Sequence, residues 1–378
     1  KPATNLFHLF SFIMEITPII EEAARLGASD VHLKPGRKPA LRIDGEMRSL
    51  GSDTPPLSDE DLLRFLDHFL ADPERRRLEE SYELDLARDI SVSKGLLRLR
   101  LNIHRQRTGW GIVIRILSDR IPGFDDLDLE PAVRELARLP RGLVLVTGPT
   151  GSGKSTTLAS LMDSINQERS RHLYSIEDPI EYLYHARRSE VTQRELGSHT
   201  RSFAAALKSA MRGDPDVILV GEMRDLETIQ LALTAAETGH LVFSTLHTCD
   251  STQSIDRIID VFPSAQQAMV RSQLANVLQA IVSQVLLPRA GDSGRVAARE
   301  ILLANAAVRN LIRESKTHQL YSTLSSSVLT GMCPLELSLA SLVRSRSVEK
   351  EDALEVANRP SVFLSYLESA QLPSRPNP

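Results

Sequence analysis

One stretch decides the fold class of this chain of 378 residues: Gly142-Leu143-Val144-Leu145-Val146-Thr147-Gly148-Pro149-Thr150-Gly151-Ser152-Gly153-Lys154-Ser155. Its second half fits G-x-x-x-x-G-K-[ST], the pattern of a phosphate-binding loop. The apolar run at its start predicts a buried strand, and the spacing of Leu158, Leu161 and Met162 after it indicates a helix. A chance glycine-rich turn would not have a strand before it and a helix after it. We therefore expect a nucleotide-phosphate site here.

The loop carries the groups that this chemistry needs. Glycines let backbone N–H groups wrap phosphate oxygens, and the start of the following helix adds partial positive charge. Lys154 would neutralise the β- and γ-phosphates, and the Ser155 hydroxyl would coordinate Mg²⁺. The predicted nucleotide-binding residues are Gly148, Pro149, Thr150, Gly151, Ser152, Gly153, Lys154, Ser155 and Thr156.

Two more predicted strands end in carboxylates. The apolar run 173–176 leads into Glu177, and the run 217–220 leads through Gly221 into Glu222. Ligands of parallel α/β sheets bind beyond the carboxyl ends of the strands. There, one carboxylate could activate a water molecule while another holds Mg²⁺ through its waters. A single carboxylate after a strand is usually a helix cap or a solvated residue, but two behind a phosphate-binding loop favour catalysis.

A fourth apolar run, 241–244, has a histidine on either side, His240 and His247. Thr245 and His247 would emerge where a sensor of the γ-phosphate would lie. A lone histidine is more often structural, so the residues alone leave both alternatives open.

These strands alternate with helical runs, which is typical of a parallel α/β sheet. Beyond Ala265 the pattern predicts mostly helix. Before the sheet, the pattern predicts a small α+β domain: a helix from Met14, short strands at 31–33 and 41–43, and a turn at Asp44-Gly45. A helix capped by Ser58 with a core stripe follows, then a two-stranded ribbon with one buried face; the stripe is Leu62, Leu63, Leu66 and Phe69, and the ribbon is 97–103 with 110–116.

The expected organisation follows from these patterns. It comprises an upstream or non-native leader (1–13), an N-terminal α+β domain (14–117), a linker (118–131), an ATPase-type domain with a helical C-terminal part (132–368) and a disordered tail (369–378).

Composition argues against several other classes of protein. Apolar residues make up 42% and charged residues 25%, as in an average soluble domain. The formal net charge of −4 gives no general attraction to nucleic acid, although it permits a local basic channel. Cys249 and Cys333 lie too far apart for a C-x-x-C zinc pair. No apolar run approaches the ~20 residues that span a bilayer, so we expect no membrane insertion.

The order of the four motifs resembles the Walker A, Asp, Walker B and His boxes of the type II/IV secretion and pilus ATPase superfamily. After the phosphate-binding loop these are Ile176–Glu181, Ile218–Asp225 and Thr245–Thr248. The resemblance covers nearly the whole chain. It implies an α/β fold: a RecA-like P-loop ATPase core with a smaller N-terminal α+β (PAS-like) domain, with ATP and Mg²⁺ as cofactors.

The resemblance also assigns roles to residues. It makes Glu177 the general base, Glu222 the Mg²⁺-linked acid, and His240 and His247 the His-box pair. It further implies a homohexamer in which N-terminal arginines reach the nucleotide of a neighbouring subunit. The ribbon offers several arginines that could equally solvate its polar face; we expect Arg100 and Arg115 to be the ones that act in trans, from among Arg98, Arg100, Arg105, Arg107 and Arg115.

Within the superfamily the chain is most similar to the PilT-type retraction ATPases. It lacks the four-cysteine zinc module of assembly and secretion ATPases, and Ala307–Glu314 resembles a segment typical of PilT-type proteins. This implies a cytoplasmic motor at the cytoplasmic face of the inner membrane that acts on a pilus platform protein. The resemblance leaves open whether a second retraction ATPase is a further partner. The alternatives are an accessory PilU-like or secretion ATPase, a non-hydrolysing regulator and, more remotely, a hexameric nucleic-acid translocase.

Overall fold

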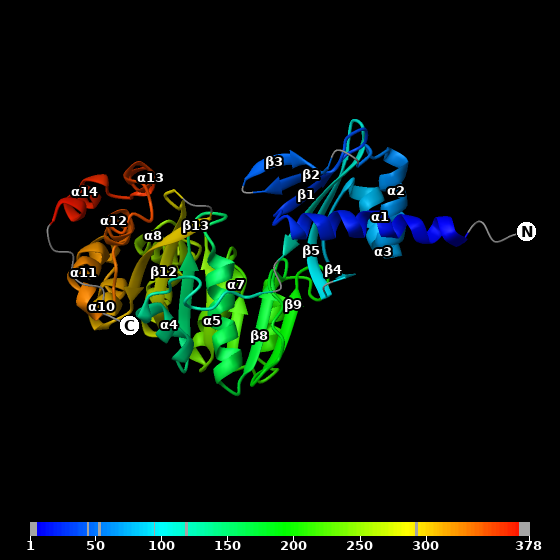
Figure 1. Cartoon of the computed structure of the whole chain (residues 1–378). Helices are drawn as coiled ribbons and strands as arrows, with labels where there is room; N and C mark the ends of the chain where they lie inside the picture. Colours follow the sequence, from blue (N-terminus) through cyan, green and yellow to red (C-terminus); the bar gives the residue numbers. More distant parts are fainter. Residues whose placement is uncertain are drawn as a thin grey trace, which may run out of the picture. The chain divides into compact units, whose positions relative to one another are not determined.

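The computed structural model describes residues 6–43, 45–51, 54–93, 95–117, 120–291 and 294–369. The chain divides into two compact units, residues 1–120 and residues 121–378 (Figure 1). No helix in the described ranges combines the length and the apolar character that a bilayer crossing requires. Apart from Ser369, the tail that the sequence predicted to be disordered lies outside these ranges.

The first unit is an antiparallel sheet with helices packed against it. Alternation along two strands buries one face of the sheet, where Leu101 lies opposite Ile114 and Ile103 opposite Ile112, and all four side chains are buried. The strand order is β3-β2-β1-β6-β5-β4. The strands are β1 (Asp30–Leu33), β2 (Ala40–Ile43), β3 (Glu46–Ser49), β4 (Glu83–Val92), β5 (Gly95–Gln106) and β6 (Gly109–Leu117), and the helices are α1 (Leu6–Arg25), α2 (Asp59–Phe69) and α3 (Asp72–Ser81).

The predicted ribbon is confirmed as β5 and β6, and Ser58 caps α2 as predicted. Three expectations were wrong. Helix α1 begins at Leu6 rather than Met14, because the run before Met14 contains no glycine or proline to stop it. Leu63 is 40% exposed, since Leu62 and Leu66 turn that helix face toward the core. The ribbon belongs to a larger sheet, because β4 pairs along β5. Strand β4 was not predicted, because charged residues alternate along it.

The second unit is built on a seven-stranded sheet of order β13-β12-β7-β11-β10-β8-β9. Strands β7 to β12 are parallel to their neighbours, and only β13 is antiparallel. Four of them confirm the predicted strands: β7 (Gly142–Thr147), β8 (His172–Glu177), β10 (Val217–Val220) and β11 (Leu241–Leu246). The others are β9 (Glu190–Glu195), β12 (Leu278–Pro288) and β13 (Arg295–Leu303).

The expectation of mostly helix beyond Ala265 was wrong for β12 and β13. Seven of the ten residues at 278–287 are apolar, and a run of this kind does not distinguish a buried strand from a buried helix. Helices do follow these strands. The helices of this unit are α4 (Pro131–Arg134), α5 (Lys154–Glu168), α6 (Phe203–Ala210), α7 (Leu226–Glu237), α8 (Ser251–Asp260), α9 (Ser264–Val277), α10 (Ala306–Arg313), α11 (Leu320–Ser326), α12 (Leu335–Arg344), α13 (Lys350–Val356) and α14 (Pro360–Glu368).

Both faces of this sheet are covered, which explains why the central strands β7, β10 and β11 are buried along their whole length. Along β7, Leu143 and Leu145 pack in one cluster with α7, α8 and α9, whereas Val144 and Val146 pack in another with α5. Because β7, β8, β10 and β11 run in parallel, their carboxyl ends meet at one edge. The phosphate-binding loop begins at that edge.

Candidate functional site

The phosphate-binding loop has the backbone geometry that its glycines predict. Gly148 and Gly153 have φ angles of +139° and +84°, which residues other than glycine rarely adopt. At Gly148 a Cβ would also overlap the carbonyl oxygen of Gln284. Gly153 is the N-cap of α5, so the loop ends at a helix N-terminus, where N–H groups are free to bind an anion.

Lys154, the first residue of α5, lies inside this loop. Its Nζ donates to the carbonyl oxygens of Gly148 and Pro149, both at 2.9 Å, and the residue is only 9% exposed. Burial lowers the pKa of Lys154, while the charges of Glu181 and Glu222 act in the opposite direction. Its ammonium group is thus held against the loop, where bound phosphates would lie.

Sequence reasoning missed a residue that braces the loop. The side chain of Gln284 on β12 donates from Nε2 to the Ser152 carbonyl oxygen at 2.6 Å and accepts from Thr157 Oγ1 at 2.9 Å. It is 3% exposed, so both bonds are shielded from water. The signal in the sequence was the polar pair Ser283-Gln284, because the other residues from Ala280 to Leu287 are apolar.

Glu177 is the last residue of β8 and is 9% exposed. Ser175 Oγ donates to its Oε1 at 2.6 Å, and Gln193 Nε2 donates to the same oxygen at 3.3 Å. Burial raises the pKa of Glu177 from 4.5 to about 7, although these hydrogen bonds and one from the Glu181 backbone favour the ionised form. Such a carboxylate can take up and release a proton near neutral pH.

The structure brings Glu222 and His247 together. Glu222 follows β10 and His247 follows β11, and His247 Nε2 lies 3.5 Å from Glu222 Oε2. Arg224 Nε also contacts that oxygen, at 2.7 Å. Glu222 and Lys154 are near enough for their charges to interact. Lys154, Glu222 and His247 therefore converge at the carboxyl edge of the sheet.

His240 is not brought to this edge. It precedes β11, so the six residues of that strand separate it from His247 by roughly 20 Å. Its Nδ1 lies 2.9 Å from the carbonyl oxygen of Ala235 at the end of α7. Within one subunit the expected His-box pair is thus split between opposite edges of the sheet, and a role for His240 in catalysis stays a prediction.

Arg100 and Arg115 belong to the first unit. They are cross-strand partners on β5 and β6 and therefore lie side by side on one face of that sheet. Arg115 is exposed, and its Nε contacts the buried Asp30 at 2.9 Å. No ion pair of Arg100 is found among the described residues. Whether either reaches a nucleotide stays a prediction.

The segment Ala307–Glu314 forms most of α10, and its polar face is used within the chain. Arg309 Nη1 donates to the carbonyl oxygens of Ala275 and Asn276, at 2.6 and 2.8 Å, at the C-terminal end of α9. Arg313 donates to the side chain of Asn276 at 2.9 Å. Arg309 thus caps the C-terminal end of α9, and Arg313 adds a side-chain contact to the same helix.

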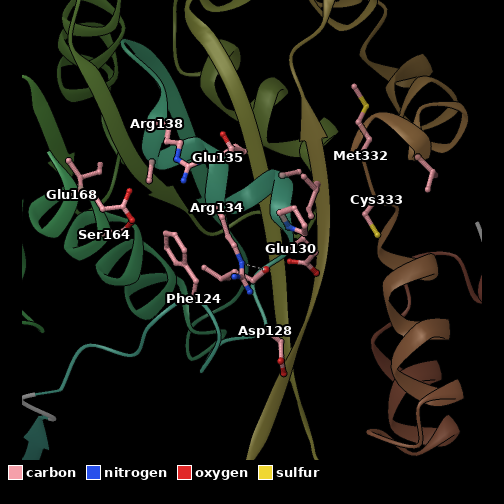
Figure 2. Close-up of a pocket in the computed structure, with 18 of the residues that line it drawn as sticks. Phe124, Asp128, Glu130, Arg134, Glu135, Arg138, Ser164, Glu168, Met332 and Cys333 are labelled. Carbon is pink, nitrogen blue, oxygen red and sulfur yellow. Dashed lines mark hydrogen bonds and ion pairs between the residues drawn. The ribbon is translucent and has the colours of Figure 1, made fainter. Parts of the chain in front are cut away.

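A cavity of about 700 Å³ lies away from the phosphate-binding loop. Figure 2 shows Phe124 and Arg134 on one side of it and Met332 and Cys333 on another. Ser164, which also lines it, comes ten residues after Lys154 on α5, about 15 Å along the helix. The cavity is therefore separate from the predicted nucleotide site.

The oxygen groups at the carboxyl edge fit a nucleotide-bound Mg²⁺. Ser155 lies in the first turn of α5, and the Glu222 carboxylate lies near Lys154. Mg²⁺ in nucleotide sites takes only one or two protein oxygens and completes its shell with phosphate and water. The described residues contain no group of three or more His, Cys, Asp or Glu side chains that could hold a metal ion.

The fold and this edge define a class of protein: a P-loop nucleotide hydrolase with a parallel, RecA-like sheet. A family model described as type II/IV secretion system protein matches residues 9–322. The chain is 45% identical to the type IV pilus retraction ATPase PilT of Pseudomonas aeruginosa over 350 residues, 93% of this chain and 100% of that relative. It is 36% identical to the type IV pilus ATPase PilU of the same organism, over 91% of this chain and 89% of the relative.

A crystal structure of the pilus retraction motor PilT with bound ADP has a TM-score of 0.85 and 46% identity, covering 92% of this chain and 98% of that chain. The chain belongs to the type II/IV secretion system protein family, and it is an ATP-hydrolysing member of that family.

Proposed function

We propose that this chain is the motor of type IV pilus retraction, working as a ring of six identical subunits. The observation that carries the proposal is the 45% identity to a retraction ATPase along that relative's whole length. The lower identity to PilU, 36%, favours the principal retraction ATPase over the accessory one.

The residues at the carboxyl edge support a mechanism for hydrolysis. The N–H groups at the start of α5 and the Lys154 ammonium group would bind the β- and γ-phosphates of ATP. Glu177 would accept the proton of the attacking water on its carboxylate. Mg²⁺, held by Ser155 and Glu222, would neutralise phosphate charge. His247, whose Nε2 lies 3.5 Å from Glu222 Oε2, would respond to the γ-phosphate.

The proposed motor needs a second subunit and a membrane partner. Arg100 and Arg115 would supply positive charge to the nucleotide of the neighbouring subunit, which stabilises charge that develops during phosphoryl transfer. The conformational change would act on a platform protein of the inner membrane, at its cytoplasmic face.

Gene deletion tests this function. Surface pili and twitching motility would be scored in the deletion strain and after complementation with the wild-type gene or with Lys154→Ala. We expect excess pili without movement, restored by the wild type alone. Loss of surface pili on deletion would instead indicate an assembly ATPase, and unchanged motility would contradict the proposal.

A further inference from the structure

Three polar side chains share one face of the sheet at β8 and β9. The two strands are parallel, with Ser175 opposite Gln193 in register. Glu177 follows Ser175 by two residues, and side chains two apart on a strand point to the same face. The register thus directs Ser175 and Gln193 toward the carboxylate of Glu177.

The amide group of Gln193 is fully engaged in this arrangement. Its Nε2 donates to Glu177 Oε1 at 3.3 Å and to the Tyr182 carbonyl oxygen at 2.9 Å, and its Oε1 accepts from the Tyr184 N–H at 2.9 Å. One side chain therefore fixes both the carboxylate and the loop that follows it. Any rotation of the amide would break three hydrogen bonds at once.

The same loop contacts the phosphate-binding region. The Tyr182 hydroxyl lies 3.0 Å from Thr156 Oγ1, in the first turn of α5. A chain of hydrogen bonds thus leads from Thr156 through Tyr182 and Gln193 to Glu177. It joins the helix that binds phosphate to the carboxylate that would act on water.

We propose that Gln193 is a positioning residue for hydrolysis: together with Ser175 it holds Oε1 of Glu177 and so presents the other carboxylate oxygen to the attacking water. This inference rests on the proposed role of Glu177 as the general base. A carboxylate that could rotate freely would spend less time aligned with the water, and alignment is a large part of catalytic rate. The amide of Gln193 is engaged by Glu177, Tyr182 and Tyr184, so its effect on hydrolysis would be exerted through Glu177.

Gln193 has a second effect, because its bond favours the ionised carboxylate. Burial and the charge of Glu181 raise the pKa of Glu177, and the Ser175 and Gln193 bonds lower it. Tyr184 also faces Glu177, but its own pKa is raised well above its usual value, so it stays neutral. Glu195, opposite Glu177 in register, is engaged by the Ile180 N–H and the Ser198 hydroxyl. Removing the Gln193 donor should therefore raise the pKa of Glu177.

The test compares full-length Gln193→Met and Gln193→Glu with the wild type. Single-turnover ATP hydrolysis would be measured from pH 5.5 to 9, together with nucleotide affinity. For Gln193→Met we expect a rate about tenfold lower. The acidic limb of the pH–rate profile, where the rate rises as Glu177 ionises, should move to higher pH by about one unit, because a hydrogen bond to a charged group is worth about that much. Nucleotide affinity should change by less than about threefold, because no phosphate contact is lost.

Gln193→Glu loses the donor to the Tyr182 carbonyl oxygen but keeps the acceptor for the Tyr184 N–H, so it retains one of the two loop contacts if Gln193→Met does not fold. It places a second carboxyl group beside Glu177, so the acidic limb should move upward further. Thr192→Val is the matched control. Thr192 lies on the same strand but bonds to His172 on the opposite face, and its loss should leave the limb in place.

An acidic limb that stays in place in both Gln193 variants would overturn the inference. Equal shifts in Thr192→Val would overturn it as well, since they would indicate a general effect on the strand. A wild-type chain that hydrolyses no ATP would overturn the proposed function and, with it, this inference. A Glu177→Gln variant with normal hydrolysis would overturn the assignment of the base and this inference, while leaving the proposed function in place.

Discussion

Replacing Glu177 with glutamine tests the centre of the proposed mechanism. The substitution keeps the shape of the side chain and an oxygen that can accept from Ser175 and Gln193, but it removes the base. A positioned general base is worth about 10²–10⁴ in rate, so hydrolysis should fall by that factor. Nucleotide binding should persist, because Lys154 and the loop are unchanged.

The pKa of Glu177 gives this prediction a second, quantitative part. A base must be ionised to accept a proton, and the pKa of about 7 means that ionisation occurs across neutral pH. The ionised fraction rises from about one-tenth at pH 6 to about nine-tenths at pH 8, so wild-type hydrolysis should rise roughly tenfold over that range. The residual activity of Glu177→Gln should lack this rise.

The assay is single-turnover hydrolysis across pH with purified rings of each variant. Glu190→Gln, an exposed carboxylate on the neighbouring strand β9, is the control and should behave as wild type. Glu181 is the competing candidate, because its charge lies near both Glu177 and Lys154. If Glu181→Gln lost hydrolysis and the pH-dependent rise while Glu177→Gln kept both, the assignment of the base to Glu177 would be refuted.

Three further predictions concern other parts of the chain. Lys154→Ala should abolish tight nucleotide binding in a fluorescent-nucleotide titration, and affinity within threefold of wild type would contradict the role of Lys154. Burial raises the pKa of Glu300 from 4.5 to about 7. Between pH 4.5 and pH 7 the carboxyl group is protonated in the native state but ionised in the unfolded state, so the protein loses stability as the pH rises through this range. Glu300→Gln cannot ionise, so in urea denaturation it should raise the free energy of unfolding by about 3 kcal/mol at pH 8 and by little at pH 4.5. Arg100→Ala and Arg115→Ala should each slow hydrolysis sharply, by about 10³–10⁵-fold for a residue that acts as an arginine finger. Rings mixed from Arg115→Ala and Glu177→Gln subunits should recover part of the activity, and no recovery in confirmed mixed rings would exclude action in trans.

The sequence predicted those strands whose local pattern of residues matches the place that they take in the fold. Strands β7, β8, β10 and β11 are short apolar runs that end in glycine or charged residues, so their type and limits could be read directly. Strand β12 could not, because an apolar run buried on both faces carries no periodicity, and β13 could not, because it contains two buried charged residues, Arg299 and Glu300. Gln284 was missed for the same reason: without β12, nothing placed that residue beside the phosphate-binding loop.

The family resemblance paired two residues that one subunit does not bring together. His240 and His247 flank the strand that the sequence predicted, and the six residues of β11 place them at opposite edges of the sheet. Arg100 and Arg115 are fifteen positions apart, yet antiparallel pairing makes them neighbours. Whether two residues become neighbours depends on the direction of the strands that carry them and on how those strands pair. The residues of a short motif do not contain that information.

The position of Glu177 shows why the site depends on contacts that no motif contains. A parallel sheet covered on both faces can deliver a carboxylate to its edge only from a strand that is itself buried, and burial there raises the pKa to about 7. Without donors the pKa would rise further, and the base would be protonated at neutral pH. Ser175, on the same strand, supplies one donor by its spacing of two residues, and a short motif can encode that. The second donor comes from β9 and depends on the register between the strands. The reactivity of the proposed base is therefore a property of strand pairing as much as of the Asp box itself.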